Sequence, residues 1–482
     1  MKTSRRDLLL SSVSGALVVA FDPLTRRFLS VASADAPLAD AVPRLDGELV
    51  FDATALQEAA TDFGGIVSHA PWAVLRPASA RDISAIVRFA RRHGLQVAMR
   101  GQAHSVFGQA QAEAGVVIDS RSLATIHDLG PNGALVDTGV TWRQLLERAV
   151  EVGLTPRVMT DYLDLSVGGV LSVGGMGGAS NLYGFVVDNC SELTVVTGEG
   201  ELVRCSQTRQ SALFRAVLGG LGQCAIIVQA RINLAPVQAL ARVHQLTYTD
   251  LGTFLADQRT ACLDERFDFL QGLVRPQPDG GFGYVLQGAR WYAPDAPASD
   301  DSAIAGLSPA NVTVQDVPYA AWAARVDSFV EQWKAAGVWT TPHPWSDLFL
   351  PDDSVEEFAR QALAELTPDD LGAGVILLYP MQRARSTRPL MRLPSSDVVW
   401  LFDVLRVPLP GSNRVESLLA QNRTLLDRAV QVGGKRYPIS AVALSPADFP
   451  AHYGAAWPYF SAAKQFWDPD HVLTPGQGVF RQ

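Results

Sequence analysis

The sequence lacks the residue patterns of a metal centre. It contains only four cysteines, Cys190, Cys205, Cys224 and Cys262, and no two of them form a C-x-x-C pair. The eight histidines are scattered, and no two are spaced as H-x-x-x-H. Zinc and iron–sulfur sites need closely spaced ligands of these kinds. We therefore expect no metal ion, and a domain of this size does not need disulfides to fold.

Basic clusters and long apolar runs are also missing. The 40 lysines and arginines are outnumbered by 49 acidic residues, which gives a net charge of −9. No basic cluster is interleaved with aromatic residues, so we expect no nucleic acid as a partner. No apolar run is long enough for a stable membrane anchor, so we do not expect an integral membrane protein. With 482 residues, 48% of them apolar, the chain has material for two domains.

The N-terminus has the features of an export signal. Arg5 and Arg6 precede an apolar run of moderate length, and small residues follow in "SVASADA". This order is typical of the twin-arginine route, with residues 1–35 as the signal and cleavage near Ala34 or Ala36. An ordinary secretory signal that carries two arginines is the alternative. Because the twin-arginine route exports folded proteins, it suits a periplasmic or secreted protein that takes up a cofactor in the cytoplasm.

Residues 36–236 read as a first lobe of mixed helices and strands. "SARDISAIVRFARRHG" has an apolar stripe at helical spacing, with Ser79 and Asp82 at the spacing of a capping box. "TWRQLLERAVEVG" predicts a second helix with Thr141 and Gln144 at the same spacing. "LQVAM" and "GVVIDS" predict strands, and "ELTVVTGEGELVRC" predicts a hairpin.

Residues 237–437 read as a second lobe. "FDFLQGLV", "GFGYVLQGARWY", "GVILLYPM" and "VVWLFDVLRV" predict strands, and "VESLLAQNRTLLDRAVQVGG" predicts a long helix. From about Tyr437 the pattern changes to loops and a short helix. The position of the last segment, 438–482, cannot be read from this pattern.

Three glycine-rich segments in the first lobe indicate a ligand that carries phosphate. They are "RGQAHS" (100–105), "SVGGVLSVGGMGGASNLYG" (166–184) and "LGGLGQ" (218–223). Glycines let backbone N–H groups approach an anion closely. One such segment is more often a surface turn, but three between apolar runs favour a buried ligand. "GGLGQCA" follows a predicted helix and precedes a strand, the reverse of a Rossmann turn, so it does not indicate NAD.

Five segments of the sequence together resemble those of a known enzyme family. "RGQAHSVFGQ", "TDYLDLSVGGVLSVGGMGG", "LFRAVLGGLGQCAIIVQARI", "TPHPWSDLFLP" and "DPDHVLTPGQGVF" resemble, in this order, the cytokinin dehydrogenases. Those enzymes belong to the p-cresol methylhydroxylase-type FAD oxidoreductases, the vanillyl-alcohol oxidase family. The resemblance implies an α+β fold of two domains: an FAD-binding domain at 36–236 and an α/β cap, the substrate domain, at 237–437. It also implies that residues 438–482 return to the FAD-binding domain.

The resemblance also assigns residues to the cofactor. His104, in the position of the histidine of R-G-x-[GA]-H-S, is expected to bond covalently to the flavin 8α-methyl group. No cysteine stands in the glycine-rich segment around Met176, so a single covalent bond is expected. The loop around the pyrophosphate is expected to comprise Arg100, Gly101, Gln102, Ala103 and Ser105. The other residues expected to contact FAD are Gln109, Asp161, Ser166, Ser172, Met176, Ile227, Tyr437 and Gln477.

Asp161 in "VMTDYLDL" is the candidate catalytic residue. A carboxylate among methionine, tyrosine and leucine is expected to be partly desolvated, which suits a general base. By itself it could equally be a loop aspartate that caps a turn. The resemblance implies that it takes the proton from the N–H of a secondary amine, while hydride passes to flavin N5. The expected substrate is an N6-isoprenoid adenine, split into adenine and an aldehyde, with oxygen or a quinone as the electron acceptor.

The substrate side departs from the plant pattern. Gln271 in "LQG" stands where plant members have a glutamate that faces the substrate entrance. Arg383 and Arg385 follow "LLYPM", where plant members have a tryptophan and an asparagine near the adenine. These arginines favour a more polar or anionic substrate, or they belong to a solvated loop. An oxidase of an alcohol, sugar or lactone therefore stays the alternative, and a non-catalytic secreted binding protein is a remote one.

Overall fold

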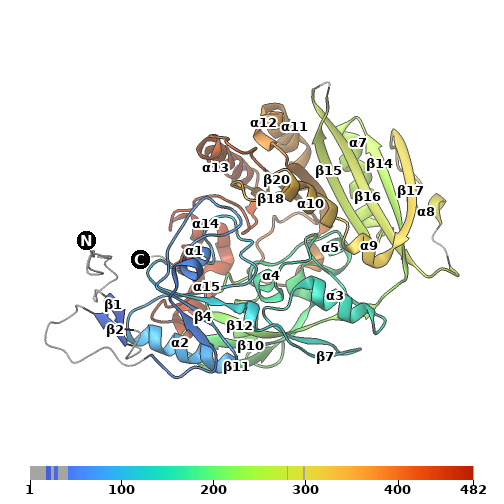
Figure 1. Cartoon of the computed structure of the whole chain (residues 1–482). Helices are drawn as coiled ribbons and strands as arrows, with labels where there is room; N and C mark the ends of the chain where they lie inside the picture. Colours follow the sequence, from blue (N-terminus) through green and yellow to red (C-terminus); the bar gives the residue numbers. More distant parts are fainter. Residues whose placement is uncertain (1–17, 23–26, 31–41, 279, 297–298, 481–482) are drawn as a thin grey trace.

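The structure, a computed structural model, describes residues 18–22, 27–30, 42–278, 280–296 and 299–480. The expected export signal falls largely on the remaining residues: Arg5, Arg6, Ala34 and Ala36 all lie outside the described ranges. Within the N-terminal part, strands β1 (Val18–Asp22) and β2 (Arg27–Ser30) pair in antiparallel fashion. The rest of the described chain forms two lobes, with the largest sheet at the upper right of Figure 1 and two smaller sheets below it.

Two sheets build the first lobe. The four-stranded sheet has the order β3-β4-β6-β5, and β4, β6 and β5 are parallel. Its strands are β3 (Glu48–Val50), β4 (Ala73–Arg76), β5 (Val97–Arg100) and β6 (Val116–Asp119). The five-stranded sheet is antiparallel, with the order β11-β10-β12-β8-β7. Its strands are β7 (Ile126–Gly130), β8 (Gly133–Asp137), β10 (Cys190–Thr197), β11 (Leu202–Ser206) and β12 (Ala225–Ile232). A small ladder joins β9 (Leu154–Pro156) to β13 (Leu234–Pro236).

The helices of the first lobe cover these sheets and connect their strands. They are α1 (Ala53–Ala59), α2 (Ala80–Arg92), α3 (Trp142–Val150), α4 (Val167–Val173), α5 (Ser180–Tyr183) and α6 (Ser211–Val217). The capping box predicted for α3 is confirmed, because Thr141 and Gln144 satisfy each other's backbone N–H groups. The one predicted for α2 is wrong: Ser79 caps the helix, but the Asp82 carboxylate accepts N–H groups outside it, from Asp46, Gly47 and Ala78.

An eight-stranded antiparallel sheet forms the second lobe. Its order is β17-β14-β16-β15-β19-β20-β18-β21, so the predicted strands β15, β16, β19 and β20 occupy its centre. The strands are β14 (Leu240–Tyr248), β15 (Phe269–Pro276), β16 (Phe282–Tyr292), β17 (Asn311–Pro318), β18 (Ser346–Pro351), β19 (Val375–Gln382), β20 (Val398–Leu405) and β21 (Lys435–Arg436).

One face of this sheet packs on helices and the other faces the first lobe. The helices of this lobe are α7 (Leu251–Leu263), α8 (Asp300–Ile304), α9 (Tyr319–Ala323), α10 (Asp327–Ala335), α11 (Val355–Glu365), α12 (Pro368–Leu371) and α13 (Val415–Gln431). Ile376, Leu378 and Phe402 point into the core that α7, α11 and α13 share with the sheet. Their neighbours Tyr379 and Leu401 belong to the core between the lobes. This period-two alternation leaves the second face of β19 and β20 free to cover a ligand held by the first lobe.

The C-terminal segment lies against the first lobe. Its helices are α14 (Asp448–Tyr453) and α15 (Trp457–Trp467). Leu473 forms a parallel bridge with Val97 of β5, and Tyr459 on α15 donates to the carbonyl of Ala212 on α6. The chain therefore reaches its end beside the strand that leads into the first glycine-rich segment.

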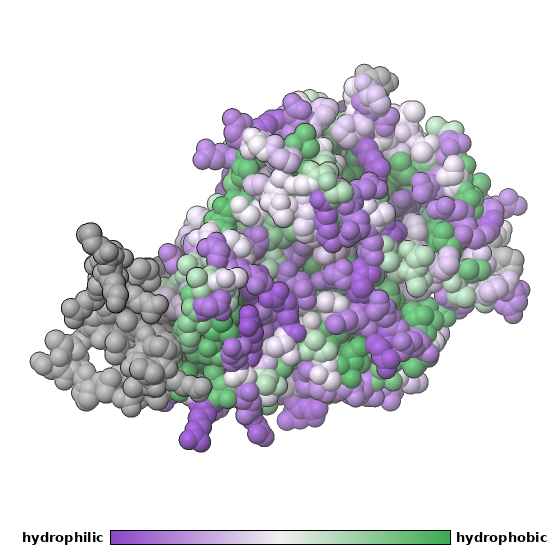
Figure 2. Space-filling view, in the orientation of Figure 1, coloured by the Kyte–Doolittle hydropathy of each residue, from purple (hydrophilic) through white to green (hydrophobic). Residues whose placement is uncertain are grey.

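The surface and the buried thiols match an ordinary globular chain. The face in Figure 2 carries hydrophilic and hydrophobic residues intermixed. All four cysteines lie in the described part of the chain as buried, free thiols. Among the described residues, no helix has both the length and the apolar character needed to span a bilayer. The same residues hold no group of three or more metal-ligating side chains.

Candidate active site

A cavity lies between the glycine-rich loops of the first lobe and the inner face of β19 and β20. Its volume is about 320 Å³, within the range typical of small-molecule sites. The sheet contributes Leu377, Tyr379, Leu401, Asp403 and Leu405. Most of the predicted cofactor residues line this one cavity: Gly101, Gln102, Ala103, His104, Ser105, Gln109, Asp161, Ser166, Ser172, Met176, Ile227, Tyr437 and Gln477.

Arg100 has a different position. Its guanidinium is buried under the loop and donates hydrogen bonds to the backbone carbonyls of Glu58, at 2.5 Å, and Thr61, at 3.2 Å. It does not line the cavity. Because these bonds tie β5 to the end of α1, Arg100 holds the loop in place from behind.

Arg383 is also outside the cavity, contrary to its prediction as a substrate residue. Strand β19 ends at Gln382, and the chain then turns outward into a short 3₁₀ helix, Arg383–Arg385, whose side chains are exposed. Arg385 pairs there with Glu265 on the surface. The arginines that follow "LLYPM" therefore form a solvated loop and do not contact the cavity.

The loop after β5 presents His104 to the cavity. Its ring stacks on Phe63 with a centroid distance of 4.0 Å, and His343 stacks on Phe63 from the other side at 3.9 Å. Burial, with a smaller contribution from His343, lowers the pKa of His104 to about 3. The imidazole is therefore neutral near pH 7 and keeps a lone pair available for bonding.

Asp161 is held by two donors from the second lobe. The Gln271 amide donates to Oδ2 of Asp161 at 2.6 Å, and the Arg325 guanidinium donates to Oδ1. Arg325 in turn lies over the rings of Phe269 and Trp322, at 4.3 and 5.0 Å from their centroids. A carboxylate offers about four acceptor sites, so two remain for a ligand after these bonds.

Arg325 was missed by the sequence analysis. It lies between α9 and α10, 164 positions from Asp161, in a stretch with no motif. The only signal in the sequence is the lone arginine in "AAWAARVDSF", three residues after Trp322. No spacing rule could connect it to Asp161, because the contact depends on how the two lobes meet.

A second, smaller cavity adjoins the first at Asp161. It measures about 100 Å³, and its wall includes the aromatic residues Tyr183, Phe269, Trp291, Tyr319 and Trp322. Asp161 is the one residue in the described part of the chain that lines both cavities. The carboxylate thus stands at the junction of the main cavity and an aromatic-lined space, where a flat ligand could rest with one end in each.

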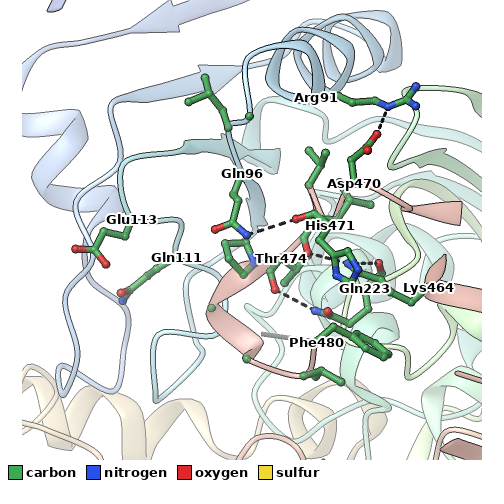
Figure 3. Close-up of a pocket in the computed structure, with 18 of the residues that line it drawn as sticks. Arg91, Gln96, Gln111, Glu113, Gln223, Lys464, Asp470, His471, Thr474 and Phe480 are labelled. Atoms are coloured by element: carbon green, nitrogen blue, oxygen red, sulfur yellow. Dashed lines mark hydrogen bonds and ion pairs between the residues drawn. The ribbon is translucent and has the colours of Figure 1, made fainter. Parts of the chain in front are cut away.

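A larger cavity, about 1160 Å³, lies elsewhere, where the C-terminal segment crosses the first lobe (Figure 3). Its polar side chains tie the segment down: Gln96 donates to the His471 carbonyl, Gln223 donates to the Thr474 carbonyl, and Lys464 donates to the Gln223 carbonyl. This groove contains neither His104 nor Asp161. The side chains around this groove hold the C-terminal segment in place. Gln477 of this segment thereby reaches the wall of the smaller cavity that His104 and Asp161 line.

The cavity around His104 fits FAD. At Gly101, a Cβ atom would lie only 2.0 Å from Oγ of Ser166, and at Gly168 only 1.7 Å from Oγ1 of Thr138. The segments that line the cavity therefore pack against each other so closely that no side chain fits at these two glycines. The wall combines these loops with apolar residues such as Met176 and Ile227. This is a lining suited to a planar ring system that carries phosphates.

Gly101→Ala is expected to lower the amount of flavin per chain in purified protein. The new methyl group forces the loop away from Ser166, at a cost of about 1–3 kcal/mol for an overpacked contact. The ratio of flavin to protein absorbance measures the effect. Gly130→Ala is the matched control, because a Cβ there meets nothing within 4 Å. Equal flavin content in the two variants would contradict the packing argument.

The fold and this cavity define a flavoprotein, and comparison with known sequences agrees. Residues 71–206 match the family described as FAD binding domain, and residues 284–480 match "Cytokinin dehydrogenase 1, FAD and cytokinin binding". The chain is therefore an FAD-dependent oxidoreductase. The fold is similar to that of 6-hydroxy-D-nicotine oxidase from Arthrobacter nicotinovorans, with a TM-score of 0.71 at 20% identity over 90% of this chain and 98% of that one.

The chain belongs to the cytokinin dehydrogenase family. It is 34% identical to cytokinin dehydrogenase 4 of Oryza sativa subsp. japonica, over 91% of this chain and 90% of the relative. It is 32% identical to cytokinin dehydrogenase 1 of Arabidopsis thaliana, over 91% and 83%. It is also 37% identical to an uncharacterized oxidoreductase, ORF5 in the fasciation locus of Rhodococcoides fascians, over 87% and 96%.

Proposed function

We propose that the protein oxidises the C–N bond of a secondary amine, an N6-isoprenoid adenine, to adenine and an aldehyde. The observation that carries this proposal is the position of Asp161, which lines the same cavity as His104 and has acceptor sites left for an N–H group. Family membership supports the same substrate class, because relatives from Oryza sativa subsp. japonica and Arabidopsis thaliana are named cytokinin dehydrogenases.

Asp161 is the base in this proposal. Gln271 and Arg325 donate to its carboxylate, which fixes its orientation in the wall of the cavity. The carboxylate accepts the proton of the amine N–H. FAD, when bound, supplies the acceptor for the hydride that leaves the adjacent carbon. The amine thus loses one proton and one hydride to become an imine, and water splits the imine into adenine and the aldehyde.

We also propose that one imidazole nitrogen of His104 bonds covalently to the 8α-methyl carbon of the flavin. The methyl C–H and the imidazole N–H would each give up a proton, and the two electrons released would pass to the flavin ring and from there to oxygen or a quinone. Support comes from the neutral ring, its place in the cavity wall and the glycine and alanine beside it, which leave room for the edge of the isoalloxazine. No cysteine lines this cavity in the described part of the chain, so the proposal is limited to one bond.

Export by the twin-arginine route, to the periplasm or the medium, is proposed on the sequence around Arg5 and Arg6 alone. A covalent cofactor is compatible with this route, because the protein would fold and load FAD before it leaves the cytoplasm. Oxygen or a quinone then serves as the electron acceptor outside.

Anaerobic mixing with N6-isopentenyladenine tests the proposed reaction. Rapid bleaching of the visible flavin band is expected, with adenine as the control that carries no alkyl group to oxidise. If the band persists while dithionite still bleaches it, C–N oxidation is wrong. The substrate would then be sought among alcohols, sugars and lactones, because Asp161 can deprotonate an O–H group as well.

A further inference from the structure

Two carboxyl groups face each other in the eight-stranded sheet of the second lobe, next to the cavity that His104 lines. Asp347 on β18 and Asp403 on β20 are directly opposite in the antiparallel register. Such pairs bring their Cβ atoms to about 4.5–5.5 Å. Asp347 is 0% exposed and Asp403 is 4% exposed, and Asp403 lines the cavity. Like charges in this arrangement are strongly destabilising, so the pair needs an explanation.

A shared proton resolves the conflict. Both oxygens of Asp347 and Oδ1 of Asp403 are buried, and within the described residues no regular hydrogen bond reaches them. The two carboxyls lie within hydrogen-bonding reach of each other, and the Ser440 hydroxyl also lies beside Asp347. Two carboxyl groups can form a hydrogen bond only when one of them is protonated. The pair therefore carries one proton between its two members.

The surroundings place this proton on Asp403. Burial raises the pKa of Asp347 to about 6, and the buried cation Arg436 favours its ionised form. Burial raises the pKa of Asp403 much further, because Asp403 also faces two carboxylates, Asp347 and Asp161. In this arrangement Asp403 donates the shared proton to Asp347, and its other oxygen remains as an acceptor.

Asp403 is the one carboxyl in the part of the cavity wall that β19 and β20 form, whose other described residues are three leucines and Tyr379. Leu401 and Leu405 flank it on the same face of β20, and Leu377 is its partner on β19. A ligand group that fits this wall is a hydrocarbon chain, and a hydrogen-bond donor on that chain would meet Asp403. When the hydrocarbon chain of the ligand carries no donor, either a water molecule fills this place or the Asp403 acceptor is left without a hydrogen bond.

We propose that Asp403 selects the substrate: its carboxyl, kept neutral by sharing one proton with Asp347, accepts a hydrogen bond from a hydroxyl group on the hydrocarbon side chain of the substrate amine. This role rests on the proposed function and adds to it a preference between substrates. A buried hydrogen bond of this kind changes the relative kcat/KM by about tenfold.

The test compares N6-isopentenyladenine with its side-chain-hydroxylated analogue by the rate of anaerobic flavin reduction. The wild-type protein is expected to prefer the hydroxylated compound about tenfold. Asp403→Leu removes the acceptor and should abolish the preference. Asp403→Asn is the matched control and should keep it, because the amide N–H donates to Asp347 and the amide oxygen faces the cavity. A preference that survives in Asp403→Leu, or is absent from the wild type, overturns the role.

Infrared spectroscopy tests the shared proton without turnover. The carbonyl stretch of a neutral carboxylic acid is expected in the wild type and should be lost in both Asp403 variants. A wild-type spectrum without this band overturns the protonation state. The two proposals fail differently: the proposed function is wrong if neither amine bleaches the wild-type flavin, whereas the role of Asp403 is wrong if both bleach it with equal kcat/KM.

Discussion

Asp161→Asn is expected to slow flavin reduction by the amine about 10²–10⁴-fold, the usual contribution of a positioned general base. The amide has nearly the same shape, and Gln271 can still donate to its oxygen, but it cannot take a proton from the substrate. Anaerobic stopped-flow measurement of the flavin band gives the rate directly. Because this readout ends at the reduced flavin, a change in the later reaction with an electron acceptor does not affect it.

Asp164→Asn is the matched control, since Asp164 lies three residues further along the same loop. Its carboxylate pairs with Arg143 and is 41% exposed, at a distance from the cavity wall. An exposed ion pair contributes little, so a loss of less than about 1 kcal/mol in stability and an unchanged reduction rate are expected. If Asp161→Asn reduced its flavin as fast as the control does, Asp161 would not be the base.

Local pattern was enough to predict much of the fold. The apolar stripe of α2, the capping box of α3 and the hairpin of β10 and β11 depend on residues close together in the chain. The error at Asp82 has the same origin. Its spacing from Ser79 is right for a capping box, but the loop around Asp46 offers N–H groups that compete for the carboxylate, and a local rule cannot include them.

The site residues that lie in sequence motifs were predicted, and the residues that only tertiary contacts bring to the site were missed. His104, Asp161 and Gln477 lie in recognisable segments, and the structure gathers all three around one cavity. Arg325 and Asp403 have no motif, because their roles arise from contacts across the lobes and between strands. A charged residue inside the strand "VVWLFDVLRV" was the available signal for Asp403: an aspartate in a buried strand needs a partner.

His104→Ala is expected to release the flavin completely from the denatured chain. The wild-type protein precipitated with acid should stay yellow, whereas the variant should leave all its flavin in the supernatant and its chain mass should fall by one FAD. In the part of the chain that the structure describes, no other histidine lines the cavity: His343 lies on the far side of Phe63. His127→Ala, a partly exposed histidine paired with Asp137, is the control and should keep the colour.

The pH dependence of attachment separates His104 from an ordinary imidazole. A ring with a pKa near 6.5 is protonated below that pH and loses the lone pair it needs to bond carbon. Burial lowers the pKa of His104 to about 3, so its ring stays neutral from about pH 5 to about pH 8. Apoprotein incubated with FAD should therefore attach it to the same extent at both ends of this range. A steep loss below about pH 6.5 would show that the attacking ring is solvated, and a yellow pellet from His104→Ala would show that another residue holds the flavin.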